Sequence, residues 1–134
     1  MRGLSVVALC AVAFVGIGCT GGANSQEAPE PPDAVTADPQ HYSVEFENDV
    51  VRVLRIRYGP GETSVMHRHP AGCVVYITGG TVTFELPDGE IVDASGTPGQ
   101  VLCDDAVVHL PTNTGDAPTN VIVVELKGRE AFSQ

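Results

Sequence analysis

Basic side chains are scarce in this sequence, and their scarcity limits the partners that the protein can have. The 134 residues include 7 Lys and Arg against 17 Asp and Glu, which gives a formal net charge of −10. A surface with this excess of negative charge repels a phosphate backbone, because both carry charge of the same sign. The composition therefore predicts a protein that does not bind nucleic acid.

The sequence also lacks an apolar run long enough to cross a bilayer comfortably. Its longest run extends from Leu4 to Ile17, whereas a membrane-spanning helix needs roughly 20 apolar residues. Arg2 precedes this run, and small residues with Cys19 follow it, which is the layout of a secretory signal. We therefore predict that residues 1–19 are an export signal and not part of the fold.

The end of this signal resembles the lipobox of bacterial lipoproteins at Gly18 and Cys19, although Gly16 stands where Leu or Val is usual. In that family the cysteine is lipidated and becomes the first residue of the mature chain. The resemblance implies a lipid anchor at Cys19, which tethers a protein to a membrane without spanning it. It also implies an extracytoplasmic location in the bacterial cell envelope. An ordinary cleaved signal is the main alternative.

A tether is predicted after the signal. Residues 20–40 contain four prolines and four acidic residues and almost no large apolar side chain. Such a segment cannot bury enough apolar surface to fold by itself. We therefore predict a disordered tether over residues 20–40 and one folded domain over residues 41–134.

Helical periodicity is the third feature that the sequence lacks, apart from the signal and the last few residues. The folded part consists instead of short apolar runs separated by turn-forming segments rich in Gly, Pro, Asn and Asp. The runs are residues 41–46, 50–58, 64–69, 73–78, 81–86, 91–94, 100–104, 106–110 and 120–126. Nine short strands at close spacing predict an all-β fold, either a sandwich or a barrel.

Alternation within the second run, VVRVLRIRY, separates two faces of the expected strand. Leu54, Ile56 and Tyr58 share one face. Arg55 and Arg57 share the other face. Either these two arginines point to water, or they edge a ligand pocket and hold an anionic group.

Histidines are the strongest sign of chemistry in this chain. His67 and His69 are two residues apart in an expected strand, so their side chains project from one face. Neutral imidazoles are common ligands of zinc, copper, iron and nickel. His109 lies near the end of another expected strand, and three imidazoles converge if that strand folds back beside the first. The alternative is a polar pair on the surface.

The segment around the histidine pair resembles motif 1 of the cupin superfamily, G(X)5HXH(X)3,4E(X)6G. Gly61 matches the first glycine, and His67 and His69 match the HXH element. Gly80 matches the last glycine. Cys73 stands where the family has its glutamate.

Motif 2 of the same family, G(X)5PXG(X)2H(X)3N, matches at His109 and Asn113, whereas Asp104 and Ala106 replace its proline and glycine. The resemblance covers roughly residues 42–127. It implies a double-stranded β-helix, which is a small jelly-roll barrel with the motif histidines at its mouth. It also implies one divalent metal ion (Zn, Fe, Mn, Ni or Cu) bound by the three histidines.

Two cysteines remain outside the signal, Cys73 and Cys103. Three interpretations of Cys73 are open. It is a fourth metal ligand, and a thiolate would then favour zinc or copper, or it forms a disulfide with Cys103, which an oxidising compartment permits. The third interpretation is a small buried apolar residue. The resemblance adds weight to the disulfide. In cupins the strand after the HXH element runs antiparallel beside the strand that precedes the last histidine.

The missing motif glutamate has a chemical consequence. Three neutral histidines leave a divalent ion its full charge and open coordination positions, so the ion is a Lewis acid that lowers the pKa of bound water. No Glu or Asp within the two motifs is an obvious general base, since Asp104 and Asp105 resemble solvated loop residues.

These features together predict an envelope-tethered, single-domain cupin that binds one metal ion and acts on a small molecule. An enzyme of this kind would be a metal-dependent dioxygenase or a small-molecule isomerase. The alternative is a metal-free cupin that binds a small ligand and catalyses nothing. Tyr76 and Asn113 are candidates for the ligand pocket, unless the tyrosine only packs and the asparagine only fixes a turn. An edge strand at Tyr42–Phe46 would allow a homodimer.

Overall fold

The structure is a computed structural model that describes residues 29–132. The predicted export signal and Cys19 therefore lie outside the described residues, as do residues 20–28 of the predicted tether. Within residues 29–132, no helix has the length and apolar character needed to cross a membrane.

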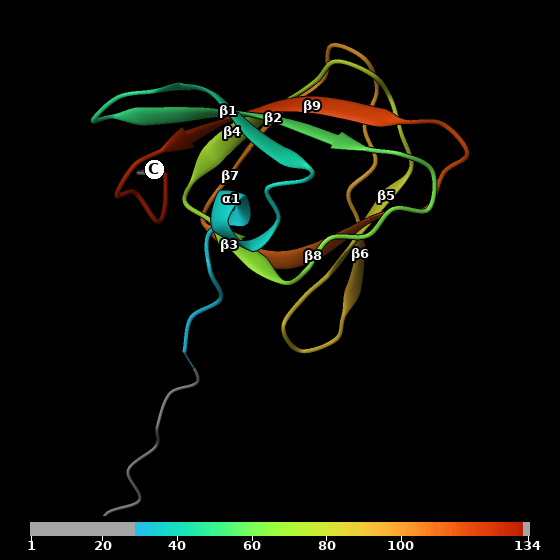
Figure 1. The fold of residues 1–134 in the computed structure, drawn as a ribbon, viewed down its shortest axis with the longest axis horizontal. Helices are drawn as coiled ribbons and strands as arrows, with labels where there is room; N and C mark the ends of the chain where they lie inside the picture. Colours follow the sequence, from blue (N-terminus) through green and yellow to red (C-terminus); the bar gives the residue numbers. More distant parts are fainter. Residues whose placement is uncertain (1–28, 133–134) are drawn as a thin grey trace, which may run out of the picture.

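Two antiparallel sheets face each other (Figure 1). One has five strands in the order β1-β2-β9-β4-β7, and the other has four in the order β3-β8-β5-β6. The strands are β1 (Tyr42–Glu47), β2 (Val51–Tyr58), β3 (His67–His69), β4 (Gly72–Tyr76), β5 (Val82–Glu85), β6 (Ile91–Asp93), β7 (Val101–Asp104), β8 (Val107–Asn113) and β9 (Thr119–Leu126). Each predicted run overlaps one of these strands, so the all-β prediction is confirmed.

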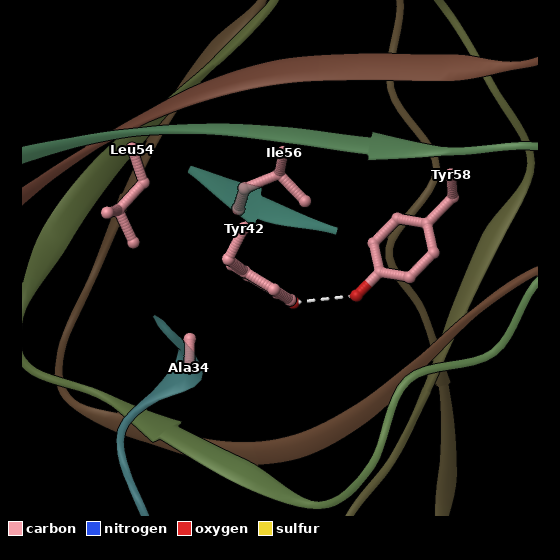
Figure 2. Close-up of a cluster of buried hydrophobic side chains, with 5 residues drawn as sticks. All are labelled: Ala34, Tyr42, Leu54, Ile56 and Tyr58. Atoms are coloured by element: carbon pink, nitrogen blue, oxygen red, sulfur yellow. Dashed lines mark hydrogen bonds between the residues drawn. The ribbon is translucent and has the colours of Figure 1, made fainter. Parts of the chain in front are cut away.

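The core lies on the inner face of β2, as the alternation predicts. Leu54, Ile56 and Tyr58 are buried there, and Tyr42 and Ala34 complete the cluster (Figure 2). The hydroxyl of Tyr58 donates a hydrogen bond of 2.8 Å to the hydroxyl of Tyr42. A buried hydroxyl needs such a partner, because an unbonded polar group in an apolar interior is costly.

The N-terminal segment corrects the predicted extent of the tether. Helix α1 (Ala34–Ala37) is ordered against the barrel, and Asp33 caps it by accepting hydrogen bonds from two backbone N–H groups. Ala34 is completely buried, and the N–H of Arg68 on β3 donates to the carbonyl of Pro32 at 3.0 Å. The fold therefore begins before residue 41. Composition missed this segment because a four-residue helix is too short to show an apolar period.

The cysteines form a disulfide, which was one of the three interpretations left open. Strands β4 and β7 pair antiparallel with Cys73 directly opposite Cys103. Their sulfur atoms are bonded, and their Cα atoms are 4.0 Å apart. The interpretation of Cys73 as a metal ligand is therefore wrong, because its sulfur has no thiolate form while it is bonded to Cys103.

Removal of this disulfide should destabilise the fold. Replacement of both residues, Cys73→Ser with Cys103→Ser, should lower the free energy of unfolding by about 3 to 4 kcal/mol, because the bond closes a loop of about 30 residues in the unfolded chain. The measurement is the midpoint of urea unfolding, with and without dithiothreitol. The reductant should lower the midpoint of the wild type and leave that of the double variant unchanged. A wild-type midpoint that stays constant after full reduction would contradict this prediction.

Candidate metal centre

Strand pairing brings the three histidines together. His67 on β3 lies directly opposite His109 on β8, and His69 lies opposite Val107. Residues opposite each other in a ladder share a face, and so do residues two apart in one strand. All three rings therefore point into the barrel, and all three are buried. Their nearest available nitrogen atoms lie within 4.8 Å of one another.

Two of the rings present the lone pair of Nε2 toward the same point. The Nδ1 atom of His67 lies 2.7 Å from the carbonyl oxygen of Val65, and Nδ1 of His69 lies 2.6 Å from a carboxylate oxygen of Glu125. Both partners are acceptors, so Nδ1 carries the proton in each ring and Nε2 carries the lone pair. The two Nε2 atoms are 3.1 Å apart. Two ligands that are each about 2.0–2.1 Å from a shared zinc ion lie about 3 Å apart.

The third ring has no partner for either of its nitrogens. Nδ1 and Nε2 of His109 are both buried, and neither makes a hydrogen bond within the described part of the chain. Most buried polar atoms are hydrogen-bonded, because desolvation without a partner is costly. An ion bound between the three rings would provide the partner that a nitrogen of His109 lacks. The donor set thus fits a divalent metal.

Burial keeps these imidazoles in the form that binds metal. Burial is the largest cause and the positive charge of a protonated His69 is the second, and together they lower the pKa of His67 to about 4 and that of His109 to about 2. Both rings are therefore neutral at neutral pH. A neutral imidazole is the form that has a lone pair to donate.

A buried carboxylate behind His69 was missed by the sequence analysis. Glu125 on β9 is only 1% exposed. One of its oxygens accepts from His69, and the other accepts from Nε of Arg52 at 2.6 Å. Burial alone would raise the pKa of Glu125, but these two hydrogen bonds outweigh it and hold the pKa below its usual value. A carboxylate in this position orients a histidine and increases its basicity toward a metal.

The sequence contains a signal that identifies Glu125. Val121 and Val123 on the same strand pack against the core. Side chains alternate along a strand, so Glu125 shares their inward face. An acidic residue at an inward position in an apolar strand needs a buried partner.

A cavity of about 560 Å³ lies beside the histidines, between the two sheets. His69 and His109 line it, together with the rings of Tyr42 and Tyr58. The hydroxyl of Tyr42 is 2.9 Å from Nε2 of His67 and is the donor, since it already accepts from Tyr58. An ion at Nε2 would take the lone pair that this hydroxyl now occupies, so the hydroxyl proton would have to turn away.

Of the two residues predicted to line the ligand pocket, Tyr76 lies at the cavity and Asn113 does not. Tyr76 lines the cavity, although its hydroxyl is occupied by a 2.8 Å hydrogen bond to the carbonyl of Ala94. Asn113 is completely buried, and its amide donates to the carbonyls of Tyr58, Gly59 and Ala117. Asn113 therefore fixes the ends of strands and has no donor left for a ligand.

The two arginines lie on the outer face of β2, away from the histidines. Nε of Arg55 donates to Glu45 at 2.8 Å, and another of its nitrogens donates to Asn120. Arg57 is exposed and lines a separate surface depression near His41. The prediction that these arginines edge the ligand pocket is therefore wrong for the cavity that His69 and His109 line.

Comparison with protein families agrees with this architecture. Residues 54–125 match the family model described as Cupin domain. The chain belongs to the cupin superfamily. A crystal structure of a cupin domain from Bordetella pertussis Tohama I is 27% identical with a TM-score of 0.60, and the match covers 75% of this chain and 99% of that one. No curated protein matches the chain.

A second solved structure has the same fold. It is an uncharacterised conserved protein with a double-stranded β-helix domain from Klebsiella pneumoniae, 20% identical with a TM-score of 0.52. The match covers 80% of this chain and 85% of that one. The predicted double-stranded β-helix, a cupin jelly roll, is confirmed.

The lowered pKa values predict how the stability of the metal-free cupin depends on pH. The unfolded chain binds protons at these histidines below about pH 6.5, whereas folded His67 binds one only near pH 4 and folded His109 near pH 2. The unfolded state binds more protons in that interval, so stability should fall as the pH falls below 6.5. The loss is up to about 1.4 kcal/mol per pH unit for each histidine.

Urea unfolding at several pH values, after chelation of any metal, measures this loss. His109→Leu removes one titrating ring, so its stability should fall less steeply than that of the wild type between about pH 6.5 and 5. Equal slopes for the two proteins would contradict the prediction.

Glu125→Gln should weaken metal binding by about 10- to 100-fold, because the charge that increases the basicity of His69 is lost. The amide would also turn a donor toward Arg52 or toward His69. Zinc affinity measured by competition with a chromophoric chelator checks this. Glu47→Gln is the matched control, since Glu47 pairs with Lys127 on the surface. An affinity equal to that of the control variant would contradict the prediction.

Proposed function

We propose that this cupin binds one divalent metal ion through His67, His69 and His109 and uses it on a small molecule held in the adjacent cavity. The observation that carries the proposal is the buried ring of His109, whose two nitrogens lack partners within residues 29–132. Its ring centroid is 4.9 Å from that of His67 and 5.3 Å from that of His69. Apolar packing alone does not account for three imidazole side chains buried side by side, because histidine is less often buried than the aliphatic residues.

The bound ion would supply Lewis acidity, either to a ligand oxygen or to a water molecule. The protein contributes neutral ligands and a proton donor. Burial raises the pKa of Tyr42 well above its usual value and raises that of Tyr58 to about 12, so both phenols stay protonated at neutral pH. Tyr58 donates to Tyr42, which in turn donates toward the centre. These groups suit hydrogen bonding to an oxygen atom of a ligand, and they do not suit removal of a proton.

The all-nitrogen donor set narrows the choice of metal only in part. With Cys73 in a disulfide, no thiolate selects for zinc or copper. Imidazoles suit zinc, copper, iron and nickel, and the resemblance to cupins adds manganese. If the protein is an enzyme, iron would support a dioxygenase and zinc or manganese a small-molecule isomerase. A second candidate function, a metal-free module that binds a small ligand, rests on the apolar cavity alone, and the metal measurement below separates the two.

We also propose that the protein is exported and held at a membrane of the cell envelope by a lipid on Cys19. The disulfide between Cys73 and Cys103 supports an oxidising compartment. Mass spectrometry of the N-terminal peptide from native membranes tests the lipid. Cys19→Ala should then shift the protein from the membrane fraction to the soluble fraction.

A homodimer through the edge strand β1, on which Val44 and Phe46 are exposed, stays a prediction.

Elemental analysis of protein purified without a polyhistidine tag should find about one divalent metal ion per chain. His67→Ala, His69→Ala and His109→Ala should each lower the affinity for the bound metal by more than about 100-fold, since loss of a ligand costs more than loss of the group behind it. Isothermal titration with that metal measures the change.

His41→Gln is the control, because His41 is the one remaining histidine and lies outside the cluster. Its ring contacts Asp38 and Glu62 instead. Metal binding that is lost equally in the control variant, or retained in all three cluster variants, would contradict the assignment of the metal to these three histidines. Wild-type protein that binds no metal would favour the metal-free alternative.

A further inference from the structure

The cavity beside the histidines has an apolar wall. Side chains from both sheets form it, so the wall is present on both sides of any molecule inside. They include Ile56, Val74, Phe84, Val92, Leu102 and Val123. The volume of about 560 Å³ is within the range of small-molecule sites. A molecule that fills this space must therefore have an apolar body.

Carboxylates stand where the cavity meets solvent. Asp93, Asp104 and Asp105 all line the cavity and are all exposed. Asp93 ends β6 and Asp104 ends β7, and these are the outermost strands of the two sheets at this opening. Leu102 on β7 also lines the cavity and is 41% exposed. The entrance therefore lies between β6 and β7 and has three negative charges.

No positive side chain offsets these charges within the cavity. Among the described residues that line it, none is Lys or Arg, and Arg55 is occupied by Glu45 on the outer face. Hydrogen bonds from Ser95 lower the pKa of Asp93, so this carboxyl is ionised at neutral pH. The carboxylate of Asp105 accepts a backbone N–H from Phe132 at 2.8 Å.

The inner end of the cavity offers the opposite chemistry. His109 lines it and is 5% exposed, and neither ring nitrogen has a partner among the described residues. Tyr42 and Tyr58 present their hydroxyls nearby. A ligand that reaches this end therefore meets a polar group, after passing the acidic entrance and the apolar wall.

We propose that the cavity selects small molecules that have an apolar body and are either uncharged or carry a positively charged amine, and that it rejects carboxylates and phosphates. The apolar body lies between the two sheets, and the amine stays at the entrance beside Asp93, Asp104 and Asp105. An anion loses water on entering and meets charge of its own sign. This inference rests on the proposed function, because the same histidine centre lies at the inner end.

Three probes of nearly equal size test the selection by charge: benzylamine, benzyl alcohol and benzoate. Binding is followed by NMR of the methyl groups of Val92, Leu102 and Val123 in the full chain, before and after removal of metal. In the metal-free protein, benzylamine should bind at least about tenfold more tightly than benzoate at low salt, whereas a bound divalent ion would attract benzoate and reduce this difference. Benzyl alcohol should fall between them, and added salt should shrink the difference.

A matched pair of triple variants attributes the preference to the entrance. Asp93→Asn with Asp104→Asn and Asp105→Asn should bring the affinities for benzylamine and benzoate within about twofold of each other. Asp49→Asn with Asp88→Asn and Asp116→Asn changes the net charge equally at exposed positions that do not line the cavity, and it should keep the preference.

The outcomes separate this inference from the proposed metal site. Benzoate binding to the metal-free protein as tightly as benzylamine would overturn the inference, even if zinc titration shows a site at the three histidines. The absence of methyl shifts with all three probes at their solubility limits would also overturn it. Failure to bind any metal, with the ranking of the probes as expected, would overturn the metal proposal and leave the selection by charge standing.

Discussion

The antiparallel pairing of β3 with β8 is the constraint on which the histidine site depends. It places His67 directly opposite His109, and the two-residue repeat of a strand adds His69 to the same face. A shift of register by one residue would turn the ring of His109 to the other side of the sheet. Strand β8 is held on its second side by β5, where Phe84 packs against the ring of His109 with centroids 3.9 Å apart. Ordinary sheet packing therefore fixes the geometry of the site before any ligand arrives.

A buried polar network extends from this site to the beginning of the fold. Glu125 contacts His69 and Arg52, and Arg52 also contacts Asp33 at 3.1 Å, the residue that caps helix α1. Desolvation of a carboxylate and a guanidinium is costly, and here each charge keeps a partner on more than one side. The segment that contains Asp33 and helix α1 is thus part of the support of the site.

The sequence predicts most of this architecture because the decisive signals are local. Short apolar runs between turn-forming segments mark the strands, and the spacing of His67 and His69 shows a shared face. The features that were missed depend on contacts between distant segments. Glu125 lies 56 residues from His69 along the chain. Helix α1 is stabilised by Ala34 packing against Tyr42 and Leu54, and not by its own four residues.

The cysteines illustrate a different limit. The local sequence allows Cys73 to be a metal ligand, a disulfide partner or a buried apolar residue. Only the pairing of β4 with β7 decides among these roles. Once decided, the bond has a topological consequence. It closes a covalent ring that contains β5 and β6, and therefore Val82, Phe84, Val92 and Asp93 of the cavity wall. A protease that cuts the exposed turn around Asp88 and Gly89 would leave both fragments attached to each other, so a nicked molecule keeps its wall in one piece.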